Sequence, residues 1–237
     1  MTVNRNKAIQ QGRLIELSPQ PLFIVGDVHG CYYTYRKLVE EHWDPDKEIL
    51  IQVGDLLNRG KHSTLCVNYS LELKEKYPDR TFFLLGNHEY HLLSYLRGKP
   101  KYKWVRQGSA ELLKELSRDP QRYADYIHWI THRPMAVETD HVFVSHAGWS
   151  LHTISPFKRS VDQSLINNRA ALRDLGKVQV LGHIPSKTGK VIFKEKANAW
   201  QIDSSAWQGY FLSGIKLSTK GKMKEIIKIP ADPRDIM

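Results

Sequence analysis

The 237-residue sequence has little cysteine and no long apolar stretch. Its two cysteines, Cys31 and Cys66, lack the spacing of a metal-binding cluster and are too few for a disulfide framework. This usage is typical of a protein in a reducing cytoplasm, which is the location we expect. No run approaches the roughly 18 apolar residues of a membrane span. The basic start MTVNRNKAIQQGRLIEL also lacks the apolar core of a secretory signal, so no membrane partner is expected.

Acidic residues are scarce relative to basic ones. The sequence has 35 Lys and Arg against 25 Asp and Glu, which gives a formal net charge of +10. A basic surface favours anionic partners such as phosphorylated molecules or nucleic acid, although a solvated basic surface without a partner has the same composition. Apolar residues make up 41% of the chain, enough for a sizeable core, and we expect a single domain over residues 1–237.

The first part of the chain alternates between strand-like and helix-like stretches. Strands are predicted at 22–25, 49–53 and 81–85, and helices at 32–42 and 63–76. Ser63 is the predicted cap of the second helix. Because strand, helix and strand follow one another at this spacing, the pattern predicts a parallel sheet, whose ligand sites gather after the carboxyl ends of the strands.

The remaining sequence changes character. Residues 88–133 are predicted to be helical, with one helix beginning at Asp119-Pro120. Short β runs then follow at 141–145, 178–181, 190–193, 198–203, 210–217 and 223–229. The change predicts an α/β (α+β) fold in which two mixed sheets pack together and helices flank them in α/β/β/α layers.

Polar side chains follow five of the predicted strands. They are Asp27 and His29 in GDVHG, Asp55, Asn58 and Arg59 in GDLLNRG, Asn87 and His88 in GNHE, His146 in FVSHAGW, and His183 in VLGHIPS. One polar residue at a strand end is typical of an ordinary turn, but five such ends in succession predict a common site. Asp, Asn and His are the oxygen and nitrogen donors that suit Mn, Fe or Zn.

These motifs, in this order and spacing, resemble the phosphoprotein phosphatase branch of the calcineurin-like metallophosphoesterases. The later stretch AWQIDSSAW is similar to the Ile-Asp-Thr-Gly strand end of that family, with Ser204 and Ser205 replacing Thr-Gly. Nucleases of the wider superfamily end in Gly-His-x-His, whereas residues 182–185 read Gly-His-Ile-Pro. The missing histidine favours the phosphatase branch, and the resemblance spans most of the chain.

The resemblance implies a centre with two divalent metal ions, Mn²⁺ first and Fe or Zn as alternatives. One ion would be held by Asp27, His29 and Asp55, and the other by Asp55, Asn87, His146 and His183. The Asp55 carboxylate would then bridge the two ions, and a hydroxide between them would attack phosphorus directly.

The resemblance also implies roles for residues around the metals. His88 would be the general acid, and Arg59 would hold the phosphoryl oxygens with help from Asn87. A second arginine follows the first late histidine in the family; Arg169 is the expected match, with Arg159 and Arg173 as rivals. Asn58 replaces a family aspartate that pairs with the acid histidine, and its amide oxygen can still accept that hydrogen bond.

The nearest carboxylate, Glu89, is an alternative partner for His88. His91, His128, His132, His141 and His152 match no motif position and are predicted to be packing or surface residues.

The motifs leave the substrate open. The first interpretation is a phosphomonoesterase that acts on phosphoserine and phosphothreonine in proteins, and the alternative is a symmetrical diadenosine tetraphosphate hydrolase. A catalytically silent phosphate-binding regulator is a remote third, supported only by Asn58. The stretch KPKYKWVRQ at 99–107 mixes basic and aromatic residues as single-strand binders do. A solvated loop is the preferred interpretation, so no specific nucleic-acid partner is expected.

Overall fold

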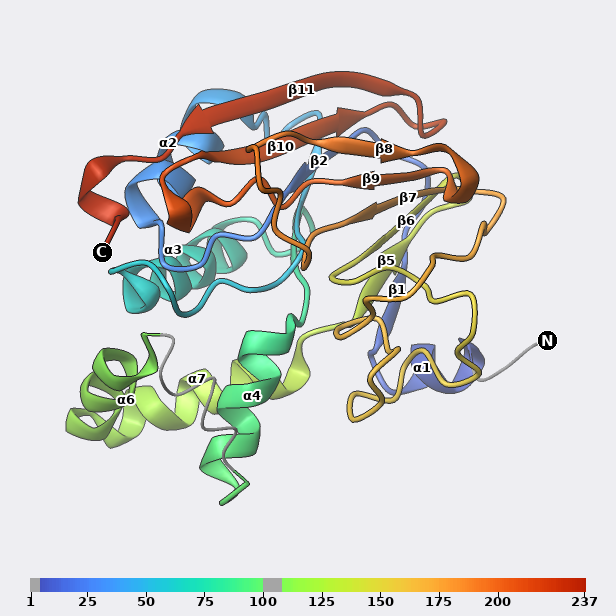
Figure 1. Ribbon diagram of the computed structural model, residues 1–237. Helices are drawn as coiled ribbons and strands as arrows, with labels where there is room; N and C mark the ends of the chain where they lie inside the picture. The colour runs from blue at the N-terminus through green and yellow to red at the C-terminus, as the bar shows by residue number, and fades with distance from the viewer. Residues whose placement is uncertain (1–4, 100–107) are drawn as a thin grey trace.

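The structure is a computed structural model that describes residues 5–99 and 108–237. Two mixed sheets form its centre, and helices flank them (Figure 1), which confirms the predicted fold class. In the five-stranded sheet the order is β11-β10-β2-β3-β4. Its members are β2 (Leu22–Val25), β3 (Ile49–Gln52), β4 (Thr81–Phe83), β10 (Phe211–Leu217) and β11 (Met223–Pro230). As predicted, β2, β3 and β4 are parallel.

The six-stranded sheet has the order β1-β5-β6-β7-β9-β8. Its members are β1 (Leu14–Glu16), β5 (Ala136–Glu138), β6 (Val142–Ser145), β7 (Val178–Leu181), β8 (Ile192–Lys194) and β9 (Ala199–Gln201). Both β1 and β5 were outside the predicted strands. Each has three residues, and so short a segment carries little alternation from which to predict a strand.

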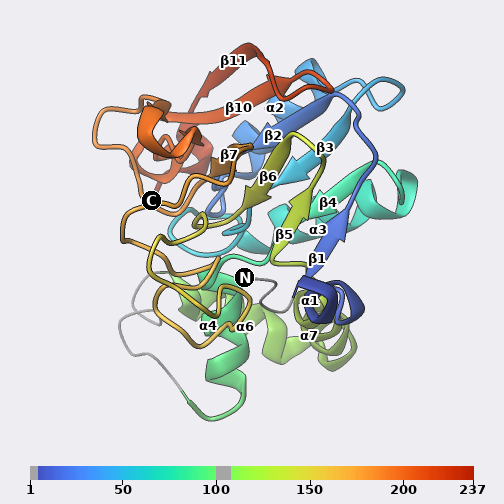
Figure 2. The ribbon, with the colours of Figure 1, turned by 90° about the vertical axis from the view of Figure 1, so that its right-hand side faces the viewer.

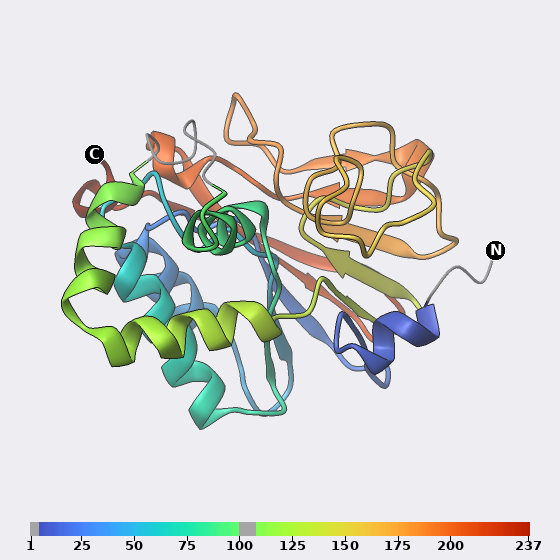
Figure 3. The same ribbon diagram turned by 90° about the horizontal axis from the view of Figure 1, so that it is seen from below.

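The helices lie around these sheets. They are α1 (Arg5–Gln10), α2 (Tyr32–His42), α3 (Ser63–Lys76), α4 (Asn87–Leu96), α6 (Ser109–Arg118) and α7 (Pro120–His132), with short 3₁₀ turns η1 (Glu195–Ala197), η2 (Ala206–Gln208) and η3 (Pro233–Asp235). Seen from below, α4 lies between α6 and α7 on one side and the long loops of residues 148–176 on the other (Figure 3). No helix of the described residues is long and apolar enough to span a membrane.

The side chains of β2 alternate between two hydrophobic cores, one on each face of its sheet. Leu22 and Ile24 of β2 face the other sheet, where they pack with Val144 and Val180. Phe23 and Val25 point the opposite way and pack under α2 and α3. Because successive side chains of a strand point to opposite faces, one fully apolar strand serves both layers.

The cap of α3 differs from the prediction. Ser63 is the first helical residue, His62 holds the cap position, and no side chain caps the helix. The Ser63 hydroxyl instead accepts a hydrogen bond from the backbone N–H of Asn58 at 2.9 Å. The hydroxyl therefore fixes the preceding loop rather than the helix. Cys31 and Cys66 are both buried free thiols.

The C-terminal turn ties α2 to that same loop. The buried Asp235 carboxylate accepts hydrogen bonds from the backbone N–H groups of Tyr33 and Thr34 at 3.1 and 2.9 Å, and from the Thr34 hydroxyl at 2.7 Å. Its backbone carbonyl accepts from the N–H of Lys61 at 3.1 Å. An anion at the first turn of a helix satisfies free N–H groups and the helix dipole together.

Replacing Asp235 with Ala is expected to lower the free energy of unfolding by about 1.5–3 kcal/mol, because buried N–H groups lose a charged acceptor. Urea unfolding measures the change. Glu40→Ala is the control, since it removes an exposed carboxylate of the same helix whose ion-pair partner among the described residues is Arg36, and its urea midpoint should stay close to that of the parent. Equal midpoints for the two variants would contradict the capping role.

Candidate metal centre

The carboxyl ends of strands from both sheets meet at one place. The backbone N–H of His183, after β7, donates to the Asp27 carboxylate, after β2, at 3.0 Å. Glycine makes this approach possible: a Cβ on Gly182 would lie 1.7 Å from Asp27 Oδ1. A Cβ on Gly26 would likewise lie 2.6 Å from the Ile202 carbonyl oxygen, so Gly182 and Gly26 allow close packing between the two sheets.

One group of donor atoms combines the third motif with the two late histidines. Asn87 Oδ1 lies 2.9 Å from His146 Nε2 and 2.8 Å from His183 Nδ1. The two ring nitrogens are 3.1 Å apart, and His146 Nε2 lies 3.4 Å from Asp55 Oδ2. Four potential ligand atoms thus lie together, and they belong to the side chains that the family resemblance implies for one metal.

A second group lies on the other side of Asp55. His29 Nδ1 donates to the Leu57 carbonyl at 2.9 Å, so His29 Nε2 is left with its lone pair, 3.5 Å from Asp55 Oδ2. Asp27 and Asp203 are buried beside them. The Asp203 carboxylate is among the groups that raise the pKa of Asp27. Asp203 belongs to the AWQIDSSAW stretch, but we had given it no role.

The chemistry of these groups fits divalent cations. Burial, followed by the positive charge of Arg59, lowers the pKa of His29 to about 3, and burial followed by Arg169 lowers that of His183 to about 3. Both rings are thus neutral, the form that binds metal. Burial raises the pKa of Asp203 to about 6. Three buried carboxylates crowded together favour cations among them. Two groups of side chains have ligand atoms close enough to hold a metal ion: His29, Asp55 and His88, and Asp55, His146 and His183.

Backbone strain is concentrated at the motif residues. His29, Asp55, Asn58, Arg59 and His183 have φ values of 46°, 56°, 70°, 75° and 68°. Non-glycine residues rarely adopt this left-handed region, and a fold retains such residues only where the surroundings enforce them. Asn198 and Ser205 also have positive φ values, so five of the seven such non-glycine residues in the described part of the chain belong to the motifs, which is typical of a preorganised site.

Glu89 organises the backbone behind the centre. Its carboxylate accepts hydrogen bonds from the N–H groups of Asp55, Leu56 and Gly86 at 2.9, 2.7 and 3.0 Å. The fully buried Arg133 lies 3.5 Å away and stacks on Trp129. The sequence does not predict this role for Arg133, because Arg133 lies in no motif and is far from Glu89 in the chain. These contacts also rule against Glu89 as the partner of His88.

The partner of His88 is Asn58. Asn58 Nδ2 donates to the Ser109 hydroxyl at 2.8 Å, which turns Asn58 Oδ1 toward His88. His88 Nδ1 therefore donates to Asn58 Oδ1 at 3.1 Å, as expected from the sequence. The backbone N–H of His88 donates to Asp55 Oδ1 at 2.9 Å. Two hydrogen bonds thus hold His88, one from its backbone N–H and one from ring Nδ1, and neither uses Nε2.

One arginine lies at the centre and a second lies near it. The Arg59 guanidinium stacks over Trp207 at 4.3 Å from the ring centroid, and among the described residues buried Arg59 Nε has no hydrogen-bond partner. Trp207 was not predicted as a site residue, although it follows Asp203 by four positions. Burial is the first cause of the lowered pKa of His146 and of His183, and the positive charge of the exposed Arg169 also lowers the pKa of both.

The rivals of Arg169 are engaged elsewhere. Arg159 donates to the Thr131 carbonyl at 3.1 Å and Arg173 to the Leu151 carbonyl at 3.0 Å. His128 and His132 stack on one another, away from the centre. The stretch at 99–107 lies outside the described residues from position 100 onward.

Comparison with known proteins supports the same family as the motifs. Residues 21–209 match the family described as calcineurin-like phosphoesterase. A protein of Glaesserella parasuis named bis(5'-nucleosyl)-tetraphosphatase, symmetrical, is 36% identical over 154 residues, which cover 60% of this chain and 52% of that protein. A protein of the same name from Actinobacillus succinogenes is 32% identical, with 65% and 55% covered. The chain thus spans about half the length of these relatives.

Solved structures show the same fold. A crystal structure provisionally named a diadenosine tetraphosphatase has a TM-score of 0.64 at 22% identity, covering 93% of this chain and 99% of that one. A protein serine/threonine phosphatase from Saccharomyces cerevisiae has a TM-score of 0.67 at 16% identity, covering 96% and 88%. At these identities the likeness concerns the fold alone.

Replacing Trp207 with Ala is expected to weaken phosphate binding by about 2- to 30-fold, the range that a cation–π contact supplies, because Arg59 loses the surface that holds it. Phosphate affinity with Mn²⁺ present is measured by calorimetry. Trp207→Phe should retain most of the affinity. Trp200→Ala is the control, because Trp200 of β9 contacts Phe193 of the edge strand β8. Unchanged phosphate affinity in Trp207→Ala would show that phosphate binding does not depend on the contact between Arg59 and Trp207.

Proposed function

The chain belongs to the calcineurin-like phosphoesterases, a family of metal-dependent hydrolases, and we propose that it hydrolyses dinucleoside tetraphosphates symmetrically. The proposed substrate class rests on the name shared by its curated relatives, bis(5'-nucleosyl)-tetraphosphatase, symmetrical. The sequence motifs alone had placed protein phosphoserine and phosphothreonine first. The relatives favour the alternative, and the net charge of +10 suits a polyanionic nucleotide.

We propose two metal ions at the centre, with Mn²⁺ as the first choice. Their ligands would be Asp27, His29 and Asp55 for one ion, and Asp55, Asn87, His146 and His183 for the other. When bound, such a pair lowers the pKa of water to supply a nucleophile and neutralises charge on the phosphoryl group. The mutual proximity of these side chains supports the assignment.

The chain's own side chains would bind and protonate the substrate. Arg59 and Arg169 would hold the phosphoryl oxygens, because a guanidinium matches two oxygens at once. His88, when doubly protonated, would deliver the proton of Nε2 to the leaving oxygen, while Asn58 Oδ1 accepts from Nδ1 and fixes the direction of the ring. Burial, followed by the charge of His29 and then of Arg59, lowers the pKa of His88 well below its usual value, and a bound anionic substrate would favour the charged ring. The leaving group of a dinucleoside tetraphosphate is itself a phosphate, which needs less protonation than the alkoxide of phosphoserine.

A direct comparison of substrates tests the proposal. Rates on diadenosine tetraphosphate, a phosphoserine peptide and a phosphotyrosine peptide are measured with Mn²⁺ present. We expect kcat/KM for diadenosine tetraphosphate to exceed the other two by about tenfold or more. Chelation should abolish every rate, and Mn²⁺ should restore it. A preference for the phosphoserine peptide would contradict the proposal and favour a protein phosphatase. No hydrolysis of any of the three substrates would favour a phosphate-binding regulator.

The acid role of His88 predicts a dependence on the leaving group. His88→Asn should keep the metal content and lower kcat on a phosphoserine peptide by roughly 10²–10⁴, the usual contribution of a general acid. The loss should be much smaller on p-nitrophenyl phosphate and on diadenosine tetraphosphate, whose leaving oxygens bear negative charge readily. Equal losses on all three substrates would show that His88 binds phosphate or supports the structure instead.

A further inference from the structure

Arg133 is a buried cation that lies outside every sequence motif. It follows α7 and is 2% exposed. Its guanidinium stacks over Trp129 at 4.2 Å from the ring centroid, and the Trp129 ring lies 6.0 Å from that of Phe83 in β4. The carbonyl of the next residue, Pro134, accepts a hydrogen bond from the backbone N–H of Leu85 at 2.8 Å. Figure 2 shows α7 below β4 and β5. The segment that carries Arg133 is therefore fixed against the end of β4, directly before the GNHE motif.

The charged partner of Arg133 is Glu89. Arg133 Nη1 lies 3.5 Å from Glu89 Oε1, and the two side chains are 2% and 0% exposed. Among the described residues, none of the three guanidinium nitrogens of Arg133 has a hydrogen-bond partner. Burial lowers the pKa of Arg133, and the negative charges of Glu89 and Asp55 act in the opposite direction. Because little water screens charges in the interior, the attraction between Arg133 and Glu89 is strong.

Glu89 holds the backbone of Asp55 in a strained conformation. Asp55 has a φ of 56°, and its N–H donates to Glu89 Oε2 at 2.9 Å. The same oxygen accepts from the N–H of Gly86 at 3.0 Å, and a Cβ on Gly86 would lie 2.2 Å from Asp55 Oδ1. A non-glycine residue persists in the left-handed region only where its surroundings enforce it. The Glu89 carboxylate is one such enforcing group, so it places the Asp55 side chain beside the turn into α4.

We propose that Arg133 is a positioning residue for metal binding. Its charge holds the Glu89 carboxylate in place, and Glu89 places Asp55, which would bridge the two ions. The inference rests on the metal centre of the proposed function and adds to it a residue outside the motifs. Arg133 acts through Glu89 rather than on the substrate, because it is buried behind the centre. Side chains that orient metal ligands in this way typically contribute about 10- to 100-fold to metal affinity.

The test is the Mn²⁺ affinity of Arg133→Met, which removes the charge and keeps a long apolar side chain against Trp129. Mn²⁺ is titrated by calorimetry into chelated, dialysed protein, at a temperature where circular dichroism shows each variant to be folded. We expect the Kd for Mn²⁺ to rise by about 10- to 100-fold. Arg133→Lys keeps the charge and should retain most of the affinity. Parent-like affinity in Arg133→Met would overturn the role of Arg133, whereas a parent protein that binds no Mn²⁺ would overturn the metal centre itself.

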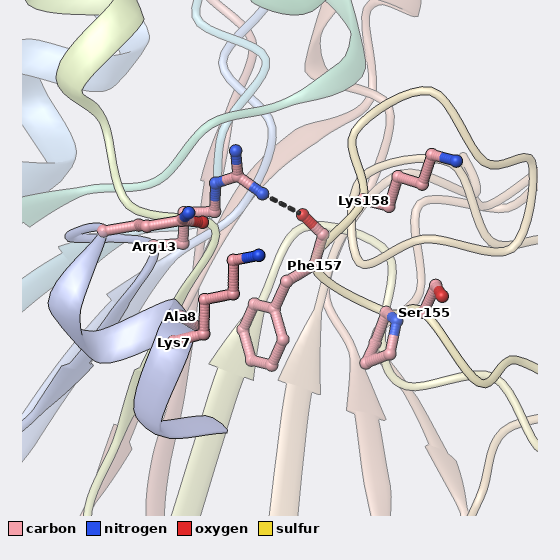
Figure 4. A pocket seen from close by; sticks show the side chains of 8 residues that line it. Lys7, Ala8, Arg13, Ser155, Phe157 and Lys158 are labelled. Atoms are coloured by element: carbon pink, nitrogen blue, oxygen red, sulfur yellow. Dashed lines mark hydrogen bonds between the residues drawn. The ribbon is translucent and has the colours of Figure 1, made fainter. Parts of the chain in front are cut away.

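Arg13→Met is the matched control. Arg13 is a half-buried arginine just before β1 that donates to the Phe157 carbonyl at 3.1 Å (Figure 4). In the part of the chain that the structure describes, it forms no ion pair with a carboxylate. The Kd of this variant for Mn²⁺ should stay close to that of the parent. An equal rise in Arg13→Met and Arg133→Met would show that the loss of any arginine charge weakens the site, which contradicts a specific role for Arg133.

A neutral pair shows whether Arg133 acts through Glu89. In Arg133→Met/Glu89→Gln no buried charge of the pair is left unpaired, so this variant should unfold at a higher urea concentration than Arg133→Met does. Its Kd for Mn²⁺ should exceed that of the parent, because a neutral amide is a weaker acceptor than a carboxylate. In the Glu89→Gln background, Arg133→Met should change the Kd less than it does in the parent. Equal changes in the two backgrounds, or parent-like affinity in the folded double variant, would overturn the proposal.

Discussion

The hydrogen bonds of one buried carboxylate organise the centre. Glu89 accepts three backbone N–H groups, from the loop after β3 and from the turn that opens α4. Those two segments carry Asp55 and Asn87, so their side chains are placed through Glu89. Arg133 lies beside the carboxylate and compensates its charge in the interior. Removing either charge would leave the other buried and unpaired, which is among the costliest changes a core can undergo.

Charge balance explains the surroundings of the centre. Asp27, Asp55 and Asp203 are each at most 3% exposed, and burial is the first cause of the raised pKa of each. The positive charges of Arg59 and Arg169 oppose this rise at Asp203. Arginine remains charged when buried, and Arg59 rests on an indole ring rather than on a carboxylate. Under the proposed function, its guanidinium nitrogens would hold phosphoryl oxygens.

The N-terminal segment extends the sheet that carries His146. The donor atoms lie at the carboxyl ends of strands, where ligand sites gather in such sheets. Strand β1 pairs with β5, and β5 pairs with β6. Strand pairing therefore fixes where Arg13, just before β1, lies relative to the end of β6.

The sequence by itself determined the strands that carry the site and the residues at their ends. Asp27, Asp55 and Asn87 could be predicted as candidate ligands because strand patterns and glycine-rich turns are local features of the sequence. Their oxygen atoms are donors that suit divalent metal ions. Only the tertiary structure decided which distant side chains meet. It paired His88 with Asn58 rather than with Glu89, set Trp207 under Arg59, and brought Arg169 to the histidines while Arg159 turned away. Such pairs depend on strand order and side-chain direction, which no local pattern encodes, because residues far apart in the chain become neighbours only when the two sheets pack.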